Sequence, residues 1–313
     1  MRNINNKFVT IGFNAYYWGE QEQNFLLAKG IGPLLREADA RWNPVRLWYD
    51  RSTMRGPHIF GLLTVGRQNA LAVQELLRSG ISGFMKKHPS THYLSKEKMA
   101  AFHKDASGKA FCADDLRDEM AGNNELLVFV HEDAEQHYPF SLCCDSRAEV
   151  FWLACKDLAF WTLLQLDSSQ PPDLAAIQLL LACDYLLLGN EEWKKEYWSY
   201  HISTLIPHLD YRRMSSEHVN AILDRLVSPD SLARIAEWKQ QMSHAADIAQ
   251  PVQELLRTVS RLRPFISQPA TRDQAMLREL IHVGLKQLGI YIVRQIPMIF
   301  TMAALGWPQP EYT

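Results

Sequence analysis

Strand and helix patterns alternate in a fixed order over the first 131 residues, and this order limits the fold more than any other feature. Short runs rich in apolar, β-branched and aromatic residues predict strands at 7–17, 44–50, 57–65 and 125–131. Apolar residues near helical spacing predict helices at 21–38 and 68–87, the first divided by Gly30, Gly32 and Pro33. The order is β-α-β-β-α-β, the split βαβ or ferredoxin-like arrangement.

The two middle strands form a predicted hairpin through the polar, glycine-containing turn at 51–56. The first of these strands alternates two sets of side chains, Val45, Leu47 and Tyr49 against Arg46, Trp48 and Asp50. Because successive side chains in a strand point to opposite faces, Arg46 and Tyr49 cannot both line a groove on one face of the sheet.

The second half of the chain is predicted to be helical. A strongly apolar helix at 147–167 comes first, and further helices are predicted at 173–188, 191–206, 215–227, 229–248, 250–263, 272–287 and 290–305. The expected fold class is therefore α+β, with a ferredoxin-like sheet region at 1–145 and a helical region at 146–313. The boundary is soft, because helices can pack directly on the sheet, so one continuous domain stays an alternative.

Residues 88–124 interrupt the sheet region. This stretch is polar and too long for an ordinary connection, so it is expected to be an excursion, a lid or a partly mobile loop.

Composition excludes several classes of protein. With 47% hydrophobic and 22% charged residues the chain is of globular type, and its net charge of −2 argues against bulk electrostatic binding of nucleic acid. No apolar run approaches the roughly 18 residues of a membrane span. The five cysteines include no CxxC pair, and no signal-peptide pattern is present, so reduced thiols and a cytoplasmic location are expected.

Motifs for common cofactors and nucleophiles are missing from the sequence. There is no GxGxxG after a strand, no Walker A loop, no HExxH and no GxSxG. His131, Glu135 and His137 form a candidate metal cluster, but a Glu and a His two residues apart face each other poorly on a helix. A metal site at these three residues is therefore not expected.

Three stretches together resemble the C-terminal domain family of lantibiotic dehydratases, also called the thiopeptide-type bacteriocin biosynthesis domain, in its stand-alone form. They are Arg46-Leu47-Trp48-Tyr49-Asp50 with Gly56-Pro57-His58-Ile59, then Glu135-Gln136-His137-Tyr138 with Asp145-Ser146, and His282 to Gly289 on a late helix. The resemblance covers nearly the whole chain. It implies a peptide-modifying enzyme whose partner is a ribosomally made precursor peptide; a homodimer or an association with other pathway enzymes is left open.

The departures from the family pattern indicate a branch. Members that eliminate glutamate from glutamylated Ser or Thr carry two arginines where this chain has Phe60 and Leu62, and the family's late Asn-Arg is replaced by Lys286-Gln287. An arginine can hold a carboxylate bidentately, whereas Phe and Leu cannot. The chain is thus most similar to the thiopeptide pyridine synthases, which join two dehydroalanines in a formal [4+2] cycloaddition and then lose water and the leader peptide. This resemblance implies a reaction that needs no metal and no organic cofactor.

Two other functions stay open. One is glutamate elimination, with Arg51 or Arg55 taking the place of the missing arginines. The other is a non-catalytic partner that binds the leader peptide and presents the substrate to another enzyme.

Nine residues form the predicted site. His282, His58 and Tyr49 are the candidate catalytic residues, and the candidate substrate-binding residues are Arg46, Trp48, Arg51, Phe60, Lys286 and Tyr291. At neutral pH a histidine can both donate and accept a proton, which suits His282. Each catalytic candidate also has a structural alternative: packing for His282, the hairpin turn for His58 and a half-buried strand position for Tyr49. Tyr291 follows His282 by nine residues, so a shared site requires the helix to break at Gly289.

Overall fold

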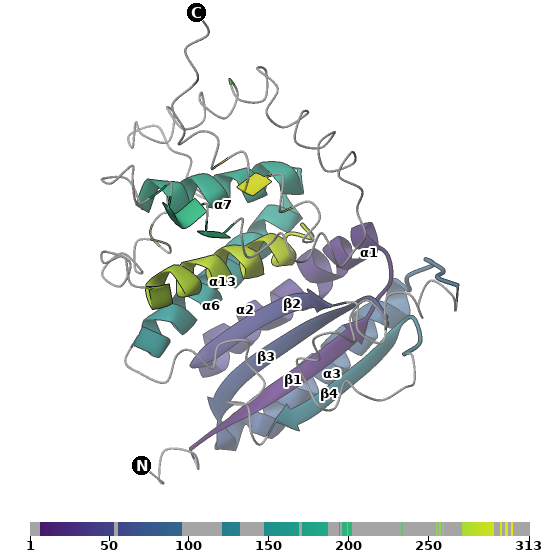
Figure 1. The fold of residues 1–313 in the computed structure, drawn as a ribbon. Coiled ribbons are helices and arrows are strands. Elements are labelled where there is room, and N and C mark those ends of the chain that lie inside the picture. Colours follow the sequence, from purple (N-terminus) through teal and green to yellow (C-terminus); the bar gives the residue numbers. More distant parts are fainter. Residues whose placement is uncertain are drawn as a thin grey trace, which may run out of the picture. The chain divides into compact units, whose positions relative to one another are not determined.

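The strand patterns of the N-terminal part form one antiparallel sheet in the computed structural model (Figure 1). Its strands are β1 (Phe8–Tyr16), β2 (Arg46–Ser52), β3 (His58–Gly66) and β4 (Glu125–His131), in the order β2-β3-β1-β4. The structure describes residues 7–52, 56–95, 121–131, 147–168, 171–186 and 271–290, together with 194, 196–198, 200–201, 233, 255, 257, 259, 295, 298–299 and 302. In these residues the fold class is α+β, as predicted.

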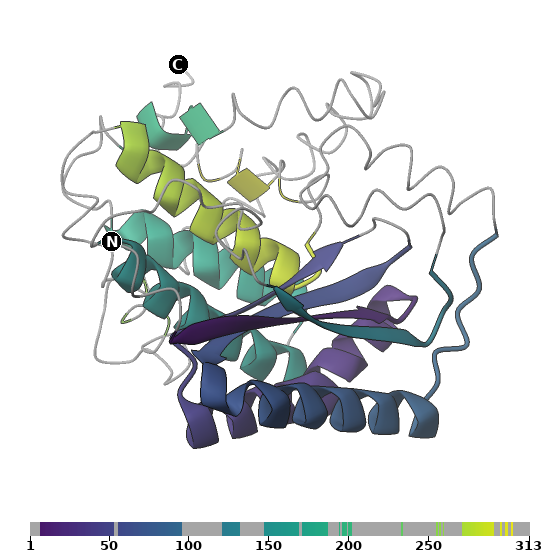
Figure 2. The ribbon, with the colours of Figure 1, turned by 90° about the horizontal axis from the view of Figure 1, so that it is seen from below.

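Helices cover one face of the sheet. They are α1 (Glu20–Phe25), the π-helix η1 (Leu26–Ile31), α2 (Gly32–Trp42), α3 (Ala70–Lys87) and α6 (Arg147–Asp167), and the short 3₁₀ helix η2 (Arg67–Asn69) precedes α3. Figure 2 shows α3 running along this face. The core between the layers combines every second residue of the strands, such as Ile11, Phe13 and Leu63, with Leu27 and Leu77 of the helices. Every second residue of the strands and every third or fourth residue of the helices therefore pack together in one apolar layer.

The predicted helix at 21–38 is divided, as its glycines and proline indicated. A π-helical turn, η1, separates α1 from α2, and Pro33 stands in the first turn of α2. A proline is tolerated there because the first backbone N–H groups of a helix have no partner within the helix. A π-turn gives poorer backbone hydrogen bonding, so its stability comes from packing, and all its residues except Lys29 are buried.

The long apolar helix α6 has the bounds that the sequence predicted, and it packs against β2 and η1. Lys156 of α6 pairs with Asp39 of α2 at 2.5 Å and donates a hydrogen bond to Asn43, which ends α2 in the left-handed conformation. The chain divides into two compact units, Met1–Gln170 and Pro171–Thr313, so α6 belongs to the unit that contains the sheet.

The second unit contains α7 (Pro172–Leu186) and α13 (Thr271–Gln287), which contact each other. The predicted helices between 191 and 263 and the one at 290–305 lie mostly outside the described residues. Among the residues that are described, no helix is both long and apolar enough to cross a membrane.

Candidate functional site

The face of the sheet that points away from α3 carries most of the candidate residues of the first unit. Strand register aligns the residues of this face in four rows across β2, β3, β1 and β4: Ser52–His58–Tyr16–Glu125, Asp50–Phe60–Asn14–Leu127, Trp48–Leu62–Gly12–Phe129 and, on the first three strands, Arg46–Thr64–Thr10. We call this the aromatic face. It brings together Arg46, Trp48, His58 and Phe60, four of the nine residues predicted from the sequence.

His58 opens β3 at the end of the aromatic face and is only 2% exposed. Its Nδ1 lies 2.9 Å from the carbonyl oxygen of Gly56, and its ring centroid lies 4.7 Å from that of Tyr16. Since a carbonyl can only accept, Nδ1 of His58 carries the proton and donates it. Gly56 has a φ of 116°, a conformation that favours glycine. The hydrogen bond ties His58 to this glycine at the start of β3, and the histidine ring lies on the aromatic face.

The middle of this face is aromatic. The rings of Trp48 and Phe60 meet edge to face with centroids 5.6 Å apart. The guanidinium of Arg46 lies 5.3 Å from the ring of Trp152 of α6, a cation–π contact. Asn14 of β1 pairs with Phe60 and is buried, and its Oδ1 accepts no hydrogen bond among the described residues. A buried amide oxygen without a donor is costly, and it can accept a peptide N–H.

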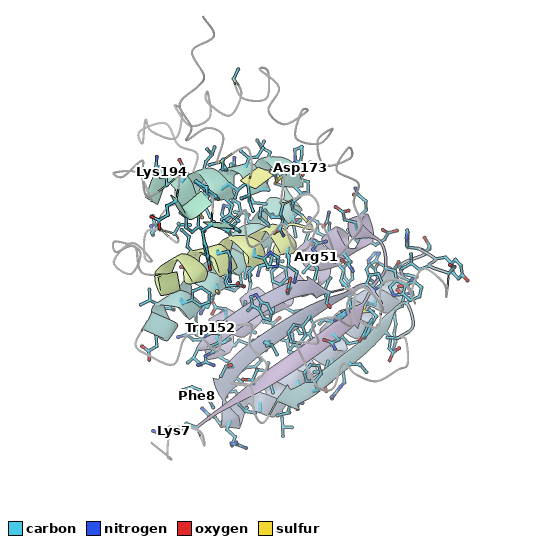
Figure 3. The ribbon with its side chains drawn as sticks, viewed as in Figure 1. Lys7, Phe8, Arg51, Trp152, Asp173 and Lys194 are labelled. Atoms are coloured by element: carbon cyan, nitrogen blue, oxygen red, sulfur yellow. The ribbon has the colours of Figure 1, made fainter. Side chains whose placement is uncertain are left out.

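Tyr49 and Arg51 lie on the opposite face, as the alternation in β2 dictates. Tyr49 is 0% exposed, its hydroxyl is 2.7 Å from the hydroxyl of Thr162 in α6, and burial raises its pKa far above the usual value. Arg51 is fully buried beside α1 (Figure 3). Its Nη2 donates to Oδ1 of Asn24 at 2.6 Å. Neither side chain shares the aromatic face with His58.

The two ends of the 88–124 excursion are tied together next to Tyr16. The Ser90 hydroxyl donates to the carbonyl of Trp18 at 2.7 Å. The side chain of Asn123 accepts a hydrogen bond from the Trp18 amide and donates to the carbonyls of Ser90 and His92. The side chain of Asn124 accepts from the amide of Ser90 and donates to its carbonyl. Asn124 also has a φ of 66°, which an Asn adopts more readily than most residues. Residues 96–120 lie outside the described residues. The Asn123-Asn124 pair before a strand was the signal in the sequence that could have indicated this anchor.

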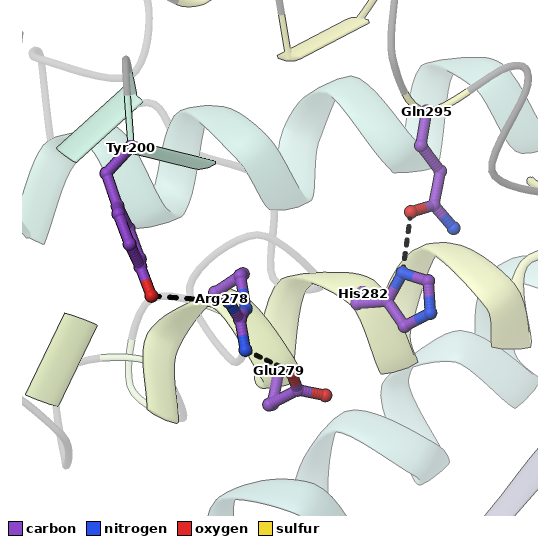
Figure 4. A network of polar contacts seen from close by, with 5 residues as sticks. All are labelled: Tyr200, Arg278, Glu279, His282 and Gln295. Atoms are coloured by element: carbon purple, nitrogen blue, oxygen red, sulfur yellow. Dashed lines mark hydrogen bonds and ion pairs between the residues drawn. The ribbon is translucent and has the colours of Figure 1, made fainter. Parts of the chain in front are cut away.

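His282, the first catalytic candidate, lies on α13 in the second unit. It is half-buried, and its Nδ1 is 2.9 Å from Oε1 of Gln295 (Figure 4). Gln295 is fully buried and donates its Nε2 to the carbonyl of Ile290 at 2.6 Å. On the same helix Arg278 pairs with Glu279 at 2.8 Å and donates to the hydroxyl of Tyr200 (Figure 4). Sequence reasoning missed Gln295.

The helix α13 ends in a geometry that explains this arrangement. Gly289 has a φ of 84°, its amide donates to the carbonyl of Lys286 at 2.9 Å, and the amide of Ile290 donates to the carbonyl of Leu285 at 2.8 Å. This pair of bonds is a Schellman motif with a left-handed glycine. The break at Gly289 that a role for Tyr291 requires is therefore present, but Tyr291 itself lies outside the described residues. Lys286 is half-buried on α13, one turn after His282.

A second histidine lies close to this group. His201 is 1% exposed, and burial, followed by the charges of His282 and Arg278, lowers its pKa to about 3. Its ring stacks on Trp198, whose Nε1 donates to Asp184 at 3.0 Å, and Lys194 lies 3.7 Å from the same carboxylate. The second unit thus contains a largely buried network in which one histidine is held neutral and another is half-exposed and hydrogen-bonded.

No group of three His, Cys, Asp or Glu side chains in the described part of the chain could hold a metal ion. The candidate cluster of His131, Glu135 and His137 falls mostly outside that part. The groups that are described can bind amides, stack on planar groups and transfer protons.

Comparisons with known proteins found similar solved structures and no similar sequences. No protein-family model matches the sequence, and no curated protein matches it. Among solved structures, the chain is similar to the pyridine synthase TbtD from thiomuracin biosynthesis, with 15% identity, a TM-score of 0.69, and coverage of 96% of this chain and 97% of that one. It is also similar to TsrL, with 12% identity, a TM-score of 0.56, and coverage of 95% and 94%.

A third solved structure is the tRNA-dependent lantibiotic dehydratase MibB from Microbispora sp. 107891, with 11% identity and a TM-score of 0.49 over 98% of this chain and 28% of that one. At such identities, the likeness to TbtD and TsrL shows that this chain shares their fold along nearly its full length.

Proposed function

We propose that this chain is an enzyme that modifies a ribosomally made precursor peptide, and that it closes a macrocycle by a [4+2] cycloaddition of two dehydroalanines. Two new bonds join the reacting dehydroalanine units, and loss of water and of the leader amide then gives a pyridine-type ring. The observation that carries the proposal is the end-to-end likeness to a pyridine synthase, which covers 96% of one chain and 97% of the other.

The architecture of the first unit is consistent with this assignment. The strand order β2-β3-β1-β4, with all neighbours antiparallel and helices between β1 and β2 and between β3 and β4, supports a ferredoxin-like sheet. Such a sheet leaves one face for the helical layer and the other for a further function.

The aromatic face supports an uncharged peptide as the substrate. The half-buried ring of Phe60 offers planar apolar surface and packs edge to face on Trp48, which is only 3% exposed. The buried Asn14 adds an amide oxygen beside Phe60, and together these groups suit a core peptide bearing azoles and dehydroalanines. The two positions where eliminating relatives carry arginine hold Phe60 and Leu62, which cannot bind a carboxylate. Arg51 is no simple replacement, because it is buried on the other face against Asn24.

The network around His282 supports the proton transfers. The cycloaddition needs an amide to tautomerise and a leaving amide to be protonated, and a half-buried histidine can do both at neutral pH. Orienting a flexible peptide so that the alkenes meet is the larger task, and it can lower the activation barrier by at most about 7–11 kcal/mol. We assign orientation to the aromatic face and proton transfer to His282.

Incubation with a linear precursor that carries its leader and two dehydroalanines tests the proposal, with mass spectrometry as the readout. Release of the leader together with a cyclic core supports cycloaddition. A glutamylated peptide that loses a glutamate-sized mass would replace the proposal with glutamate elimination. Tight binding of the leader with no change in mass in either assay would instead identify a non-catalytic binding partner.

A further inference from the structure

We propose that Gln295 is a positioning residue that holds the His282 ring in the tautomer with its proton on Nδ1, which makes Nε2 the nitrogen that accepts a proton. The inference deepens the proposed function and rests on it for the chemical role of Nε2, but the tautomer itself follows from hydrogen bonding alone.

The orientation of the Gln295 amide comes from Ile290. The carbonyl of Ile290 can only accept a hydrogen bond, so the atom 2.6 Å from it is the NH₂ group of the amide. The other end of the amide, Oε1, therefore faces His282 at 2.9 Å (Figure 4). An amide oxygen has no proton to give, so the hydrogen bond requires a proton on Nδ1. A neutral imidazole carries a single ring proton, which leaves Nε2 as the acceptor.

The backbone makes this orientation stable. The Schellman motif at Gly289 turns the chain after α13 and uses the amides of Gly289 and Ile290 to satisfy carbonyls of the last turn. The carbonyl of Ile290 accepts a hydrogen bond from Nε2 of Gln295, which is fully buried. Reversing the amide would put two acceptors face to face in a buried place, which costs about 1–3 kcal/mol for the lost donor. The amide is thereby a fixed reference for the histidine.

When a hydrogen-bond acceptor holds one ring nitrogen of a histidine base, it decides which nitrogen carries the proton and which one meets the substrate. Gln295 is such an acceptor for His282. Among the described residues, the titratable and charged groups near His282 are His201 and Tyr200, together with Arg278, Glu279 and Lys286 on α13. Asp184 and Lys194 lie next to Trp198, on which His201 stacks. His201 stays neutral to about pH 3. A neutral partner acceptor such as Gln295 fixes the tautomer without adding a charge to the site.

The test is long-range ¹H–¹⁵N spectroscopy of the protein with ¹⁵N-labelled histidine rings, in which His282→Asn identifies the signals of His282. The expected spectrum at neutral pH has a protonated Nδ1 and an unprotonated Nε2. In Gln295→Leu, which has no acceptor, the His282 signals should shift toward a mixture of the two tautomers. Gln295→Glu keeps an acceptor oxygen at Nδ1 but loses the donor to the Ile290 carbonyl, so it should keep the proton on Nδ1 when the spectrum is recorded at a pH where the ring is neutral. The two variants thereby separate the hydrogen bond at Nδ1 from packing.

The matched control is Gln23→Leu, the same change at another buried glutamine, on α1. It should leave the His282 spectrum unchanged. A native spectrum with the proton on Nε2, or a Gln295→Leu spectrum identical to the native one, would overturn the inference. In the ring-closing assay, Gln295→Leu should lower kcat by about 10-fold to 100-fold with KM nearly unchanged, within the roughly 10²–10⁴-fold that acid–base catalysis supplies.

The two proposals fail in different ways. If the tautomer is as expected and no precursor peptide is cyclised, the assignment of Gln295 stands and the proposed reaction falls. If peptides are cyclised while Nε2 carries the proton, the reaction stands and the role of Gln295 falls.

Discussion

The hydroxyl of Tyr49 lies between a strand and a helix, in a place that water does not reach. It is 2.7 Å from the hydroxyl of Thr162, which also donates to the carbonyl of Ala159 at 2.9 Å. Burial raises the pKa of Tyr49, so its phenol is neutral over the whole range in which an enzyme works. These contacts describe a residue that joins β2 to α6, and we propose that it contributes to stability instead of reacting with substrate.

Replacing Tyr49 by Phe tests this assignment. Because Thr162 keeps its bond to Ala159, we expect Tyr49→Phe to lower the free energy of unfolding by only about 1 kcal/mol. Urea unfolding followed by tryptophan fluorescence measures that loss, and the ring-closing rate should stay at the native value. A variant that unfolds normally but cyclises its peptide at least tenfold more slowly would return Tyr49 to the reaction.

His201 makes the stability of the second unit depend on pH. Its pKa is about 3 in the folded chain and about 6.5 when unfolded, so between these values the unfolded state binds a proton that the folded state does not. Stability contributed by this difference is complete above pH 6.5 and is lost as the pH falls toward 3, by about 1.4 kcal/mol for each pH unit.

The free energy of unfolding, measured at several pH values from 7 to 4, should therefore fall less steeply with decreasing pH for His201→Gln than for the native chain. His92→Gln is the control, because His92 is exposed and its replacement should leave the native slope. Equal slopes for the native chain and His201→Gln would contradict the buried, neutral state of His201.

At the scale of elements, the end of α13 determines where the polar groups of the second unit meet. The left-handed glycine at 289 stops the helix, and the following carbonyl orients Gln295. The ends of the 88–124 excursion are likewise determined by a short polar anchor, Ser90 with Asn123 and Asn124, placed where β4 begins beside Tyr16. In both cases a side chain near an element's end satisfies backbone groups and so positions the adjoining segment.

Two glycine-to-alanine changes separate the effect of the left-handed glycine at the end of α13 from general helix propensity. Gly289→Ala places a Cβ on a residue with a φ of 84°, and we expect a loss of about 1–2 kcal/mol in the free energy of unfolding. Gly83→Ala lies inside α3, where an added Cβ would meet nothing within 4 Å, so it should stabilise the chain by about 0.5–1 kcal/mol. Thermal unfolding compares the two. If both variants gained stability, the helix end would not depend on the glycine.

At the scale of the whole molecule, binding and chemistry are proposed to reside in different units. Phe60→Ala removes a ring from the aromatic face and should weaken binding of the precursor peptide by about tenfold, or 1.4 kcal/mol, with little effect on kcat. His282→Ala should do the reverse, with kcat reduced by about 10²-fold or more and leader binding near normal.

Fluorescence anisotropy with a labelled precursor measures binding, and the ring-closing assay measures turnover. Leu71→Ala is a suitable control, since Leu71 is 80% exposed on α3, and both quantities should stay native. If Phe60→Ala and His282→Ala lowered binding and turnover in the same proportion, this division of roles would be wrong.

Periodicity in the sequence was sufficient for the elements that the structure describes. The bounds of α6, the strands β1 to β4, the division of the first helix at its glycines and the break at Gly289 were all predictable, because each depends on side chains close together in the chain. The period of two also placed Arg46 and Tyr49 on opposite faces, and the strand pairing agrees with that placement.

Sequence patterns thus specify local features: which residues form each element, and which side chains share a face. Packing of the elements settles which face is the helical core, so that Tyr49 and Arg51 are enclosed there while Trp48, His58 and Phe60 lie together on the other side. Packing also brings Gln295 to His282 across the end of a helix, and Thr162 to Tyr49 across 113 positions of sequence. The difference arises because local patterns reflect backbone geometry, whereas the partner of a buried polar group depends on elements that are distant in the chain.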